Sequence, residues 1–128
     1  YVERIVELGR TYLADGRSLV HGDFFPGSWL RTPNGIRIID PEFCFTGTPS
    51  FDLGVMLAHL FLSNQPEGIL QYVRSAYSAD TPILTLANGF AGAEIMRRLI
   101  GVAQLPLDVP ISKKRELLDL SYHLVLGI

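Results

Sequence analysis

Hydrophobic residues recur at helical spacing at the start of the chain and through most of its second half. Gly16 suits a left-handed cap after the first helix, and Ser50 suits the N-cap of the second. Gly89 and Gly92 weaken the pattern of the longest helix. The expected helices cover residues 1–14, 50–62, 66–77, 83–103 and 112–126.

Between the first two helices, the pattern changes to short apolar runs separated by turn residues. Runs at 29–31 and 36–39 flank Thr32-Pro33-Asn34-Gly35, and Asn-Gly between two such runs predicts a β-hairpin. Pro41 ends the second strand because proline cannot donate to a ladder, and residues 41–50 are expected to form a loop. One small hairpin among five helices predicts a mostly helical α+β unit without internal repeats.

The composition narrows the classes of protein. The chain has 128 residues, 48% of them hydrophobic, which is enough for one domain or one lobe of a larger one. Eleven basic and 13 acidic side chains give a net charge of −2, so we expect no nucleic-acid partner and no membrane partner. The single cysteine, Cys44, excludes an intrachain disulfide and favours a cytoplasmic location.

Three carboxylates stand where strands meet loops. Asp23 precedes the first hairpin strand, and Asp40 and Glu42 follow the second, so the hairpin brings them to the same end. Converging carboxylates repel one another unless a proton or cation lies between them. Mg²⁺ takes one or two protein carboxylates together with substrate phosphates. Asp23 alone would be interpreted as a turn residue, but Asp40 and Glu42 at a hairpin's distance from it favour a magnesium–phosphate site.

Three segments carry a resemblance to a known family. HGDFFPGSWL, IIDPEFCFTGTPSFDLG and EIMRRLIGVAQL, in this order, resemble the aminoglycoside and choline kinases, which are small-molecule phosphotransferases of the protein-kinase-like fold. Within that branch they most resemble the methylthioribose kinases, which act in methionine salvage. The resemblance extends from about residue 17 to residue 105. It implies the C-terminal catalytic lobe of a kinase that uses ATP and Mg²⁺ to phosphorylate a hydroxyl of a sugar-like substrate.

The resemblance also implies a role for each matching acid. Asp23 would be the catalytic base that accepts the proton of the substrate hydroxyl. Asp40 and Glu42 would hold the metal, with Asp40 thereby binding the nucleotide as well. Ser28 occupies the position of the metal-binding asparagine of related kinases and would contribute to cofactor binding. A small residue that permits close packing is an equally open interpretation of Ser28.

The remaining residues that match the family would support the catalytic loop or contact the substrate. By resemblance, His21 and Asp52 would brace the catalytic loop, Asp52 by accepting hydrogen bonds from backbone N–H groups. An acid in the first turn of a helix also stabilises that helix through its dipole, which is the alternative interpretation of Asp52. Arg97 and Arg98 resemble residues that contact the sugar substrate. Neighbours on a helix diverge by about 100°, so the two need not share a ligand. Phe25 stands where the family commonly has histidine, which leaves the acceptor open.

A kinase of this type also needs a phosphate-covering loop and a strand lysine, which this sequence lacks. Its only lysines are Lys113 and Lys114, and no G-x-G-x-x-G occurs. We therefore expect residues 1–128 to be the catalytic lobe of a longer kinase, inactive without its ATP-binding lobe. The acceptor could instead be an aminoglycoside, choline or homoserine. The sequence is also compatible with a non-catalytic pseudokinase lobe that acts as an interaction module, and with a homodimer.

Overall fold

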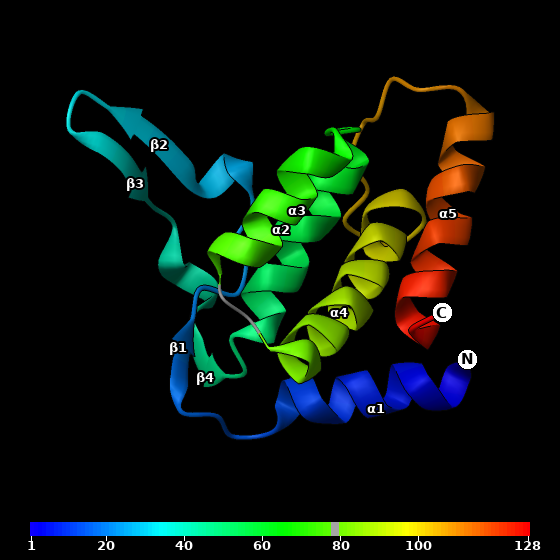
Figure 1. Ribbon diagram of the computed structural model, residues 1–128, viewed down its shortest axis with the longest axis horizontal. Helices are drawn as coiled ribbons and strands as arrows, with labels where there is room; N and C mark the ends of the chain where they lie inside the picture. The colour runs from blue at the N-terminus through cyan, green and yellow to red at the C-terminus, as the bar shows by residue number, and fades with distance from the viewer. Residues whose placement is uncertain (78–79) are drawn as a thin grey trace.

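The computed structural model describes residues 1–77 and 80–128. Over this part of the chain it contains five α-helices, two 3-10 helices (Pro26–Ser28 and Pro41–Phe43) and four short strands, so the prediction of a mostly helical α+β fold is confirmed (Figure 1). The elements are α1 Val2–Leu13, β1 Ser18–Val20, β2 Trp29–Thr32, β3 Gly35–Ile38, β4 Phe45–Gly47, α2 Ser50–Leu62, α3 Glu67–Ala76, α4 Thr81–Leu99 and α5 Ile111–Leu126.

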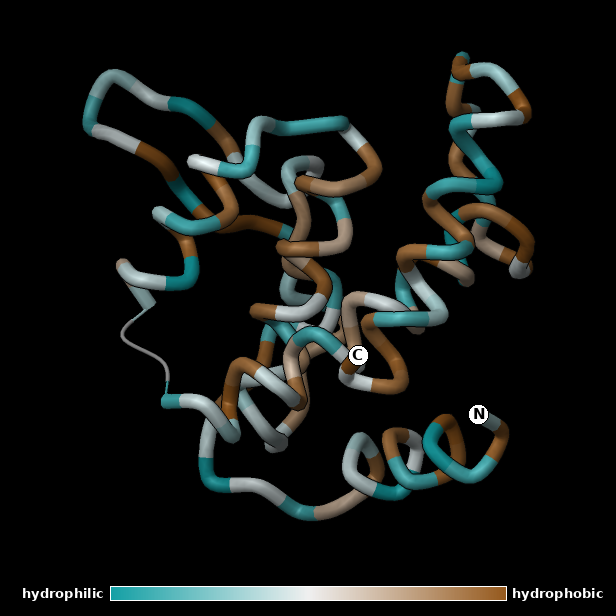
Figure 2. The backbone as a smooth tube through the Cα atoms, turned by 45° about the vertical axis from the view of Figure 1, so that its right-hand side comes forward, coloured by the Kyte–Doolittle hydropathy of each residue, from teal (hydrophilic) through white to brown (hydrophobic). Residues whose placement is uncertain are grey.

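The core lies around α4, which packs against α2 on one side and α5 on the other (Figure 1). Apolar and polar residues alternate along the helices in Figure 2, as expected for helices that bury one face. No helix in the described ranges combines the length and the hydropathy needed to cross a membrane. The buried apolar residues of the main cluster are Leu53, Leu57, Ala58, Leu62, Leu70, Ala87, Ala91, Ile95 and Leu117.

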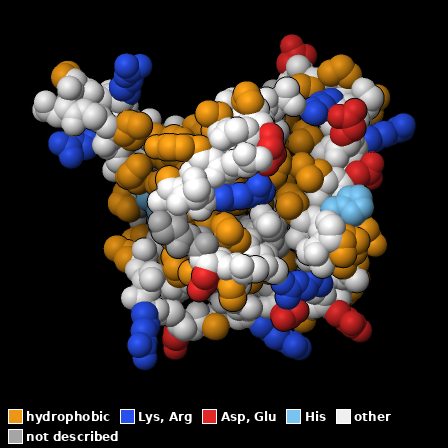
Figure 3. Space-filling view, viewed as in Figure 1, with side chains coloured by type: hydrophobic (Ala, Val, Ile, Leu, Met, Phe, Trp, Pro, Cys, Tyr) orange, Lys and Arg blue, Asp and Glu red, His pale blue; other side chains and the backbone are white. Residues whose placement is uncertain are grey.

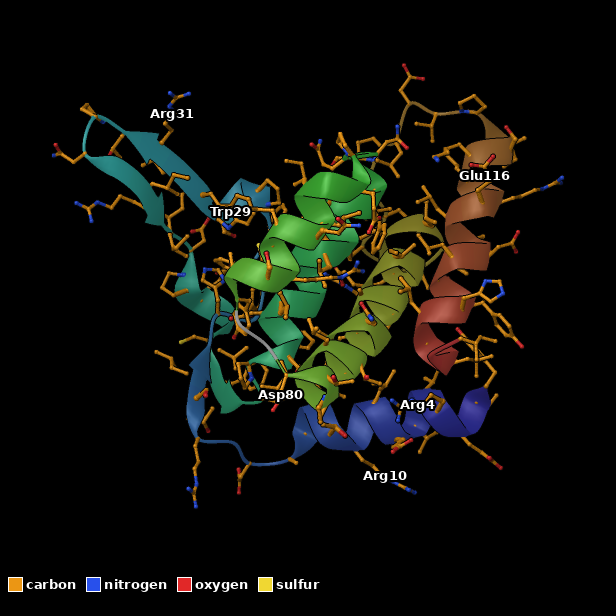
Figure 4. The ribbon with its side chains drawn as sticks, in the orientation of Figure 1. Arg4, Arg10, Trp29, Arg31, Asp80 and Glu116 are labelled. Carbon is orange, nitrogen blue, oxygen red and sulfur yellow. The ribbon has the colours of Figure 1, made fainter. Side chains whose placement is uncertain are left out.

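A second, smaller cluster joins α1 to this core. Leu8 of α1 packs with Phe90 of α4 and Val125 of α5, all three buried. Helix α1 therefore packs across the second half of α4 and the C-terminal end of α5, and the two chain termini lie close together in Figures 1 and 2. Asp80 caps α4 by accepting a hydrogen bond from the backbone N–H of Ile83 at 3.0 Å (Figure 4).

The predicted hairpin is confirmed as β2 and β3, which pair antiparallel from Trp29 opposite Ile38 to Thr32 opposite Gly35. Gly35 has a φ of 104°, which a residue with a side chain rarely adopts. The hairpin projects from the body of the molecule, and apolar side chains gather where it meets the helices in Figure 3. Figure 4 shows Trp29 at its base and Arg31 on its outer part.

The prediction of a loop over 41–50 is wrong in part. A 3-10 helix covers Pro41–Phe43, and β4 follows at Phe45–Gly47 and pairs antiparallel with β1. Strands of three residues are too short to show an alternating pattern, and this pair forms across more than 20 residues of chain. The β1–β4 pair matters because it sets the two segments that flank the candidate site side by side.

Two expected caps are also wrong. The chain leaves α1 at Ala14 in an extended conformation, and Gly16 instead packs its backbone tightly against Gly47. Ser50 lies inside α2 after the N-cap Pro49, and its buried hydroxyl has no hydrogen-bond partner among the described residues. Helix α4 begins at Thr81 and ends at Leu99, about four residues earlier than expected at its C-terminus. At Gly16 the close contact with Gly47 replaces the local capping signal.

Candidate active site

The loop that carries Asp23 is held by a carboxylate of the core. Asp52, in the first turn of α2, accepts hydrogen bonds from the backbone N–H groups of His21, at 2.7 Å, and Gly22, at 3.0 Å. Hydrogen bonds to an ionised acceptor are stronger than neutral ones, and both of these join the loop to a well-packed helix. The backbone on either side of the Gly22 peptide is therefore fixed relative to α2.

Gly22 is required by its conformation and by its surroundings. Its φ is 86°, and a Cβ at this position would overlap the carbonyl group of Phe43. The absence of a side chain lets residues 21–23 lie directly against residues 41–43. The loop that carries Asp23 and the segment that carries Asp40 and Glu42 are thus neighbours.

His21 and Ser28 join the same two segments by hydrogen bonds. His21 Nε2 lies 2.8 Å from the carbonyl oxygen of Ile39, and its Nδ1 accepts a hydrogen bond from the N–H of Asp23 at 3.3 Å. Buried Ser28 donates its hydroxyl to the carbonyl of Asp23 at 2.8 Å, and its own carbonyl accepts from the N–H of Ile39 at 2.9 Å. Both residues thus connect the Asp23 loop to the end of β3.

Asp40 and Glu42 lie exposed at the start of the 3-10 helix that follows β3. Asp40 adopts a φ of 60°, which is uncommon for a residue with a side chain. Neither carboxylate forms a hydrogen bond or ion pair within the described part of the chain, so their oxygens are available, and hard oxygen donors fit Mg²⁺. Residues 1–77 and 80–128 contain no group of three or more His, Cys, Asp or Glu side chains arranged around a metal ion, and a magnesium site of two carboxylates stays a prediction.

Asp23 faces the two arginines of α4. Its Oδ1 accepts a hydrogen bond from Arg98 Nη2 at 3.1 Å, and Arg97 Nη2 lies 3.8 Å from the same oxygen. Both arginines also bind Glu94, one turn earlier on the helix: Arg97 Nε donates to Oε2 at 2.6 Å and Arg98 Nε to Oε1 at 2.7 Å. The structure therefore brings Asp23, Arg97 and Arg98 together around a fourth residue, Glu94, which opens the segment EIMRRLIGVAQL but has no predicted role there.

Glu94 is ionised in this cluster. Its side chain is only 6% exposed, and this burial raises its pKa, but contacts with His59, Arg97 and Arg98 outweigh the burial and lower the pKa from 4.5 to about 2. His59 Nε2 lies 3.5 Å from Glu94 Oε1. The hydrogen bonds to Glu94 raise the pKa of Arg97 despite its partial burial.

The lowered pKa of Glu94 predicts a pH-dependent contribution to stability. The ionised carboxylate stabilises the fold above pH 4.5 and stops doing so as the pH falls through about 2. The drop in pKa corresponds to about 3 kcal/mol at neutral pH. In urea unfolding of the chain, Glu94→Gln should lower the free energy of unfolding at pH 6, and the gap to the original chain should shrink towards pH 2.

The matched control for this titration is Glu116→Gln, which removes an exposed carboxylate paired with Lys113 on α5 (Figure 4). It should leave the pH dependence of the unfolding free energy unchanged. Parallel curves for Glu94→Gln and the original chain would show that Glu94 does not titrate with folding.

Phe25 packs inside the same cluster. The guanidinium carbon of Arg98 lies 5.3 Å from the centroid of the Phe25 ring, and the ring of His59 lies 4.8 Å from it. Gly27 leaves room for Phe25, since a Cβ there would meet its ring. Phe25 thus restricts Arg98, which is only 11% exposed, while Arg97 is 44% exposed.

These charged residues form one end of a pocket of about 510 Å³ between α1, α4 and the loops after β1 and β3. Asp23, Glu94, Arg97 and Arg98 supply its polar groups. Its remaining lining is largely apolar and comes from distant parts of the chain: Ile5, Leu8, Tyr12, Phe43, Phe51 and Phe90. The pocket therefore suits a molecule with polar groups at one end and an apolar group at the other.

Sequence reasoning missed Glu94 and this apolar lining. A signal for Glu94 exists, because it stands three and four residues before the arginine pair, the spacing at which helical side chains meet. The three phenylalanines of the lining, Phe43, Phe51 and Phe90, carry no such signal, since aromatic residues at these spacings are equally expected in a core.

The carboxylate loop braced on a core helix beside a hairpin is the arrangement that the resemblance to kinase-like phosphotransferases implies. Residues 5–86 match the sequence profile of the phosphotransferase enzyme family (APH), and the chain belongs to this family. The resemblance predicted from the three segments is thereby confirmed.

Several curated relatives are methylthioribose kinases. The chain is 33% identical to that of Bacillus pumilus (strain SAFR-032), over 88% of this chain and 37% of the relative. It is 29% identical to that of Geobacillus sp. (strain WCH70), over 94% of this chain and 39% of the relative. It is 29% identical to the methylthioribose kinase of Exiguobacterium sibiricum, over 77% of this chain and 34% of the relative. The chain thus spans somewhat more than a third of the length of these relatives.

Proposed function

We propose that this chain is the catalytic lobe of an ATP- and Mg²⁺-dependent kinase that phosphorylates a hydroxyl of a neutral sugar such as methylthioribose, in methionine salvage. The observation that carries the proposal is the pocket in which Asp23 faces Arg97 and Arg98 across from an apolar wall. Membership of the phosphotransferase family and similarity to methylthioribose kinases support the same activity.

In the proposed mechanism Asp23 orients the acceptor. Its carboxylate accepts a hydrogen bond from the reacting hydroxyl, points that oxygen at the terminal phosphorus and takes up its proton. Arg98 holds Asp23 at 3.1 Å, and Asp52 and Ser28 hold the backbone around it. Phosphoryl transfer needs mainly position and charge stabilisation, so a rigid loop is what the chemistry requires.

Asp40 and Glu42 would hold the Mg²⁺, with Ser28 beside them in the loop tied to β3. When bound, the metal neutralises charge on the oxygens of the transferring phosphoryl group. The hydrogen bonds of His21 and Ser28 to Ile39 keep this segment in register with Asp23. Base and metal ligands are thereby carried on one connected unit.

The lining of the pocket supports a sugar with an apolar substituent over an aminoglycoside, choline or homoserine. Arg97 and Arg98 can donate to sugar oxygens, and the aromatic wall can bury a group such as methylthio. Choline and aminoglycosides are cations, and the polar end offers them no net negative charge, because Arg97 and Arg98 neutralise the carboxylates of Asp23 and Glu94. Homoserine has no apolar end to fill the remaining volume.

The test is turnover by the complete protein that carries this chain, with Mg²⁺-ATP and a panel of acceptors. We expect methylthioribose to give the highest kcat/KM, with choline, homoserine and an aminoglycoside at least about a hundredfold lower. A higher kcat/KM for one of the other three would reassign the acceptor. No ADP formation with any of them would favour a non-catalytic pseudokinase lobe.

The proposal includes an ATP-binding lobe that precedes this chain in the complete protein and supplies the phosphate-covering loop and lysine. Reading the gene upstream of residue 1 tests this directly. An in-frame segment with those features supports a two-lobe kinase, and a start codon at the beginning of this chain argues against one.

A further inference from the structure

Arg97 and Arg98 reach one carboxylate although their side chains leave α4 about 100° apart. Arg97 binds Glu94 with two atoms, Nε at 2.6 Å and Nη2 at 2.9 Å, and Arg98 binds it with Nε at 2.7 Å. The spacings are i,i+3 and i,i+4, so the bonds fold both long side chains back along the helix towards its N-terminus.

This arrangement fixes the arginines and leaves part of each one available. Within residues 1–77 and 80–128, no hydrogen bond is found for the Nη1 atom of either guanidinium. Both arginines line the pocket next to Asp23. Glu94 thus holds both guanidinium groups at the wall of the pocket beside Asp23.

The charges of the cluster cancel. Two guanidinium groups, Arg97 and Arg98, face two carboxylates, Asp23 and Glu94, and the lowered pKa of Glu94 keeps its carboxylate ionised at neutral pH. Without Glu94 the same pocket end would carry a formal charge of +1. Two arginines around one carboxylate would then attract an anion, because guanidinium groups bind oxyanions with paired hydrogen bonds.

We propose that Glu94 is a specificity-determining positioning residue: its carboxylate aligns both arginines towards the acceptor and neutralises them, so that the pocket selects neutral hydroxyl compounds over anions. This inference rests on the proposed kinase function, which defines the acceptor. It assigns the selectivity of the acceptor pocket to Glu94, a residue that takes no part in the predicted phosphoryl transfer. Glu94 acts through the arginines and touches no reacting atom in this scheme.

Two substitutions in the complete protein separate the two parts of this role. Glu94→Gln removes the charge and keeps most of the shape, whereas Glu94→Asp keeps the charge and shortens the reach by one methylene. Inorganic sulfate is the probe for anion binding, measured by calorimetry without nucleotide, and the KM for methylthioribose is the probe for alignment. Glu116→Gln, which removes an exposed carboxylate from an i,i+3 pair with Lys113, is the matched control (Figure 4).

We expect Glu94→Gln to bind sulfate about tenfold more tightly than the original protein, and Glu94→Asp to bind it unchanged. Both variants should raise the KM for methylthioribose about tenfold or more, with little change in the KM for ATP. Adding Arg97→Ala to Glu94→Gln should return the sulfate affinity to its original value, which locates the anion at the arginine pair. Glu116→Gln should change neither quantity.

The inference is overturned if sulfate affinity in Glu94→Gln and the KM for methylthioribose in both variants equal those of the original protein. If Glu94→Gln does not fold, an unchanged KM in Glu94→Asp overturns it alone, and a raised KM supports the alignment. If the complete protein turns over no hydroxyl acceptor, the proposed function fails, and the sulfate measurement still decides whether Glu94 neutralises the pair.

Discussion

Replacing Asp23 with asparagine should lower the kcat of the complete protein by about 10²–10⁴-fold, the range that a positioned general base contributes. Asparagine retains the size of the side chain and the bond to Ser28, which involves the backbone carbonyl of residue 23. It cannot accept the proton of the hydroxyl, and it loses the charge that pairs with Arg98 at 3.1 Å. The KM for ATP should change little, since the described contacts of the Asp23 carboxylate are with Arg97 and Arg98.

The matched control is Asp119→Asn, an exposed carboxylate on α5 that forms no ion pair among the described residues. It should retain full activity. Circular dichroism of both variants checks the fold, and initial rates with methylthioribose and Mg²⁺-ATP give kcat. An Asp23→Asn protein with more than about a tenth of the original kcat is not consistent with Asp23 as the base.

The parts of the fold that the sequence predicts well depend on local signals. Asn34-Gly35 predicts the hairpin because a left-handed residue is needed at that turn, and Gly35 indeed has a φ of 104°. The helices follow from apolar spacing. Strand β4 escapes prediction because its pairing with β1 depends on contacts far along the chain, and the cap expected at Gly16 is wrong because its constraint is the neighbouring Gly47. Information of this kind is not present in any short window of sequence.

The residues of the candidate site also divide into those with a signal in the sequence and those that only the tertiary contacts reveal. Asp23 and Asp40 stand out in the sequence because the hairpin between them predicts a common location, and Ser28 stands out through the family resemblance alone. Glu94 does not, although the E-x-x-R-R spacing places it beside both arginines, because an acid near arginines on a helix is equally typical of a solvated surface. Only its burial distinguishes the two cases. Phe25 is similar, since its packing between His59 and Arg98 involves residues 34 and 73 positions away.

The glycines inside the helices are where the structure most clearly reverses the expectation from the sequence. Helical glycine costs about 1 kcal/mol relative to alanine, so the sequence pattern marks Gly89 and Gly92 as weak points of α4. In the fold, a Cβ at Gly92 would lie 2.5 Å from the carbonyl oxygen of Ser121 in α5, and a Cβ at Gly89 would press on the methyl groups of Leu8 in α1. Gly54 of α2 does the same towards α4: a Cβ there would lie 2.7 Å from both the carbonyl oxygen of Ala87 and the Cβ of Phe90. Close helix packing is what these residues contribute.

Replacing Gly54 with alanine should therefore destabilise the chain by about 2 kcal/mol, even though alanine is the better helix former. The obstacle is the backbone of α4, which cannot move aside as a flexible side chain would, so α2 must shift away from its main partner. Gly9→Ala in α1 is the matched control, because a Cβ there meets nothing within 4 Å. It should stabilise the chain by up to about 1 kcal/mol. Urea unfolding of the three proteins measures both changes, and a Gly54→Ala chain as stable as Gly9→Ala would mean that α2 and α4 do not approach as closely as the fold requires.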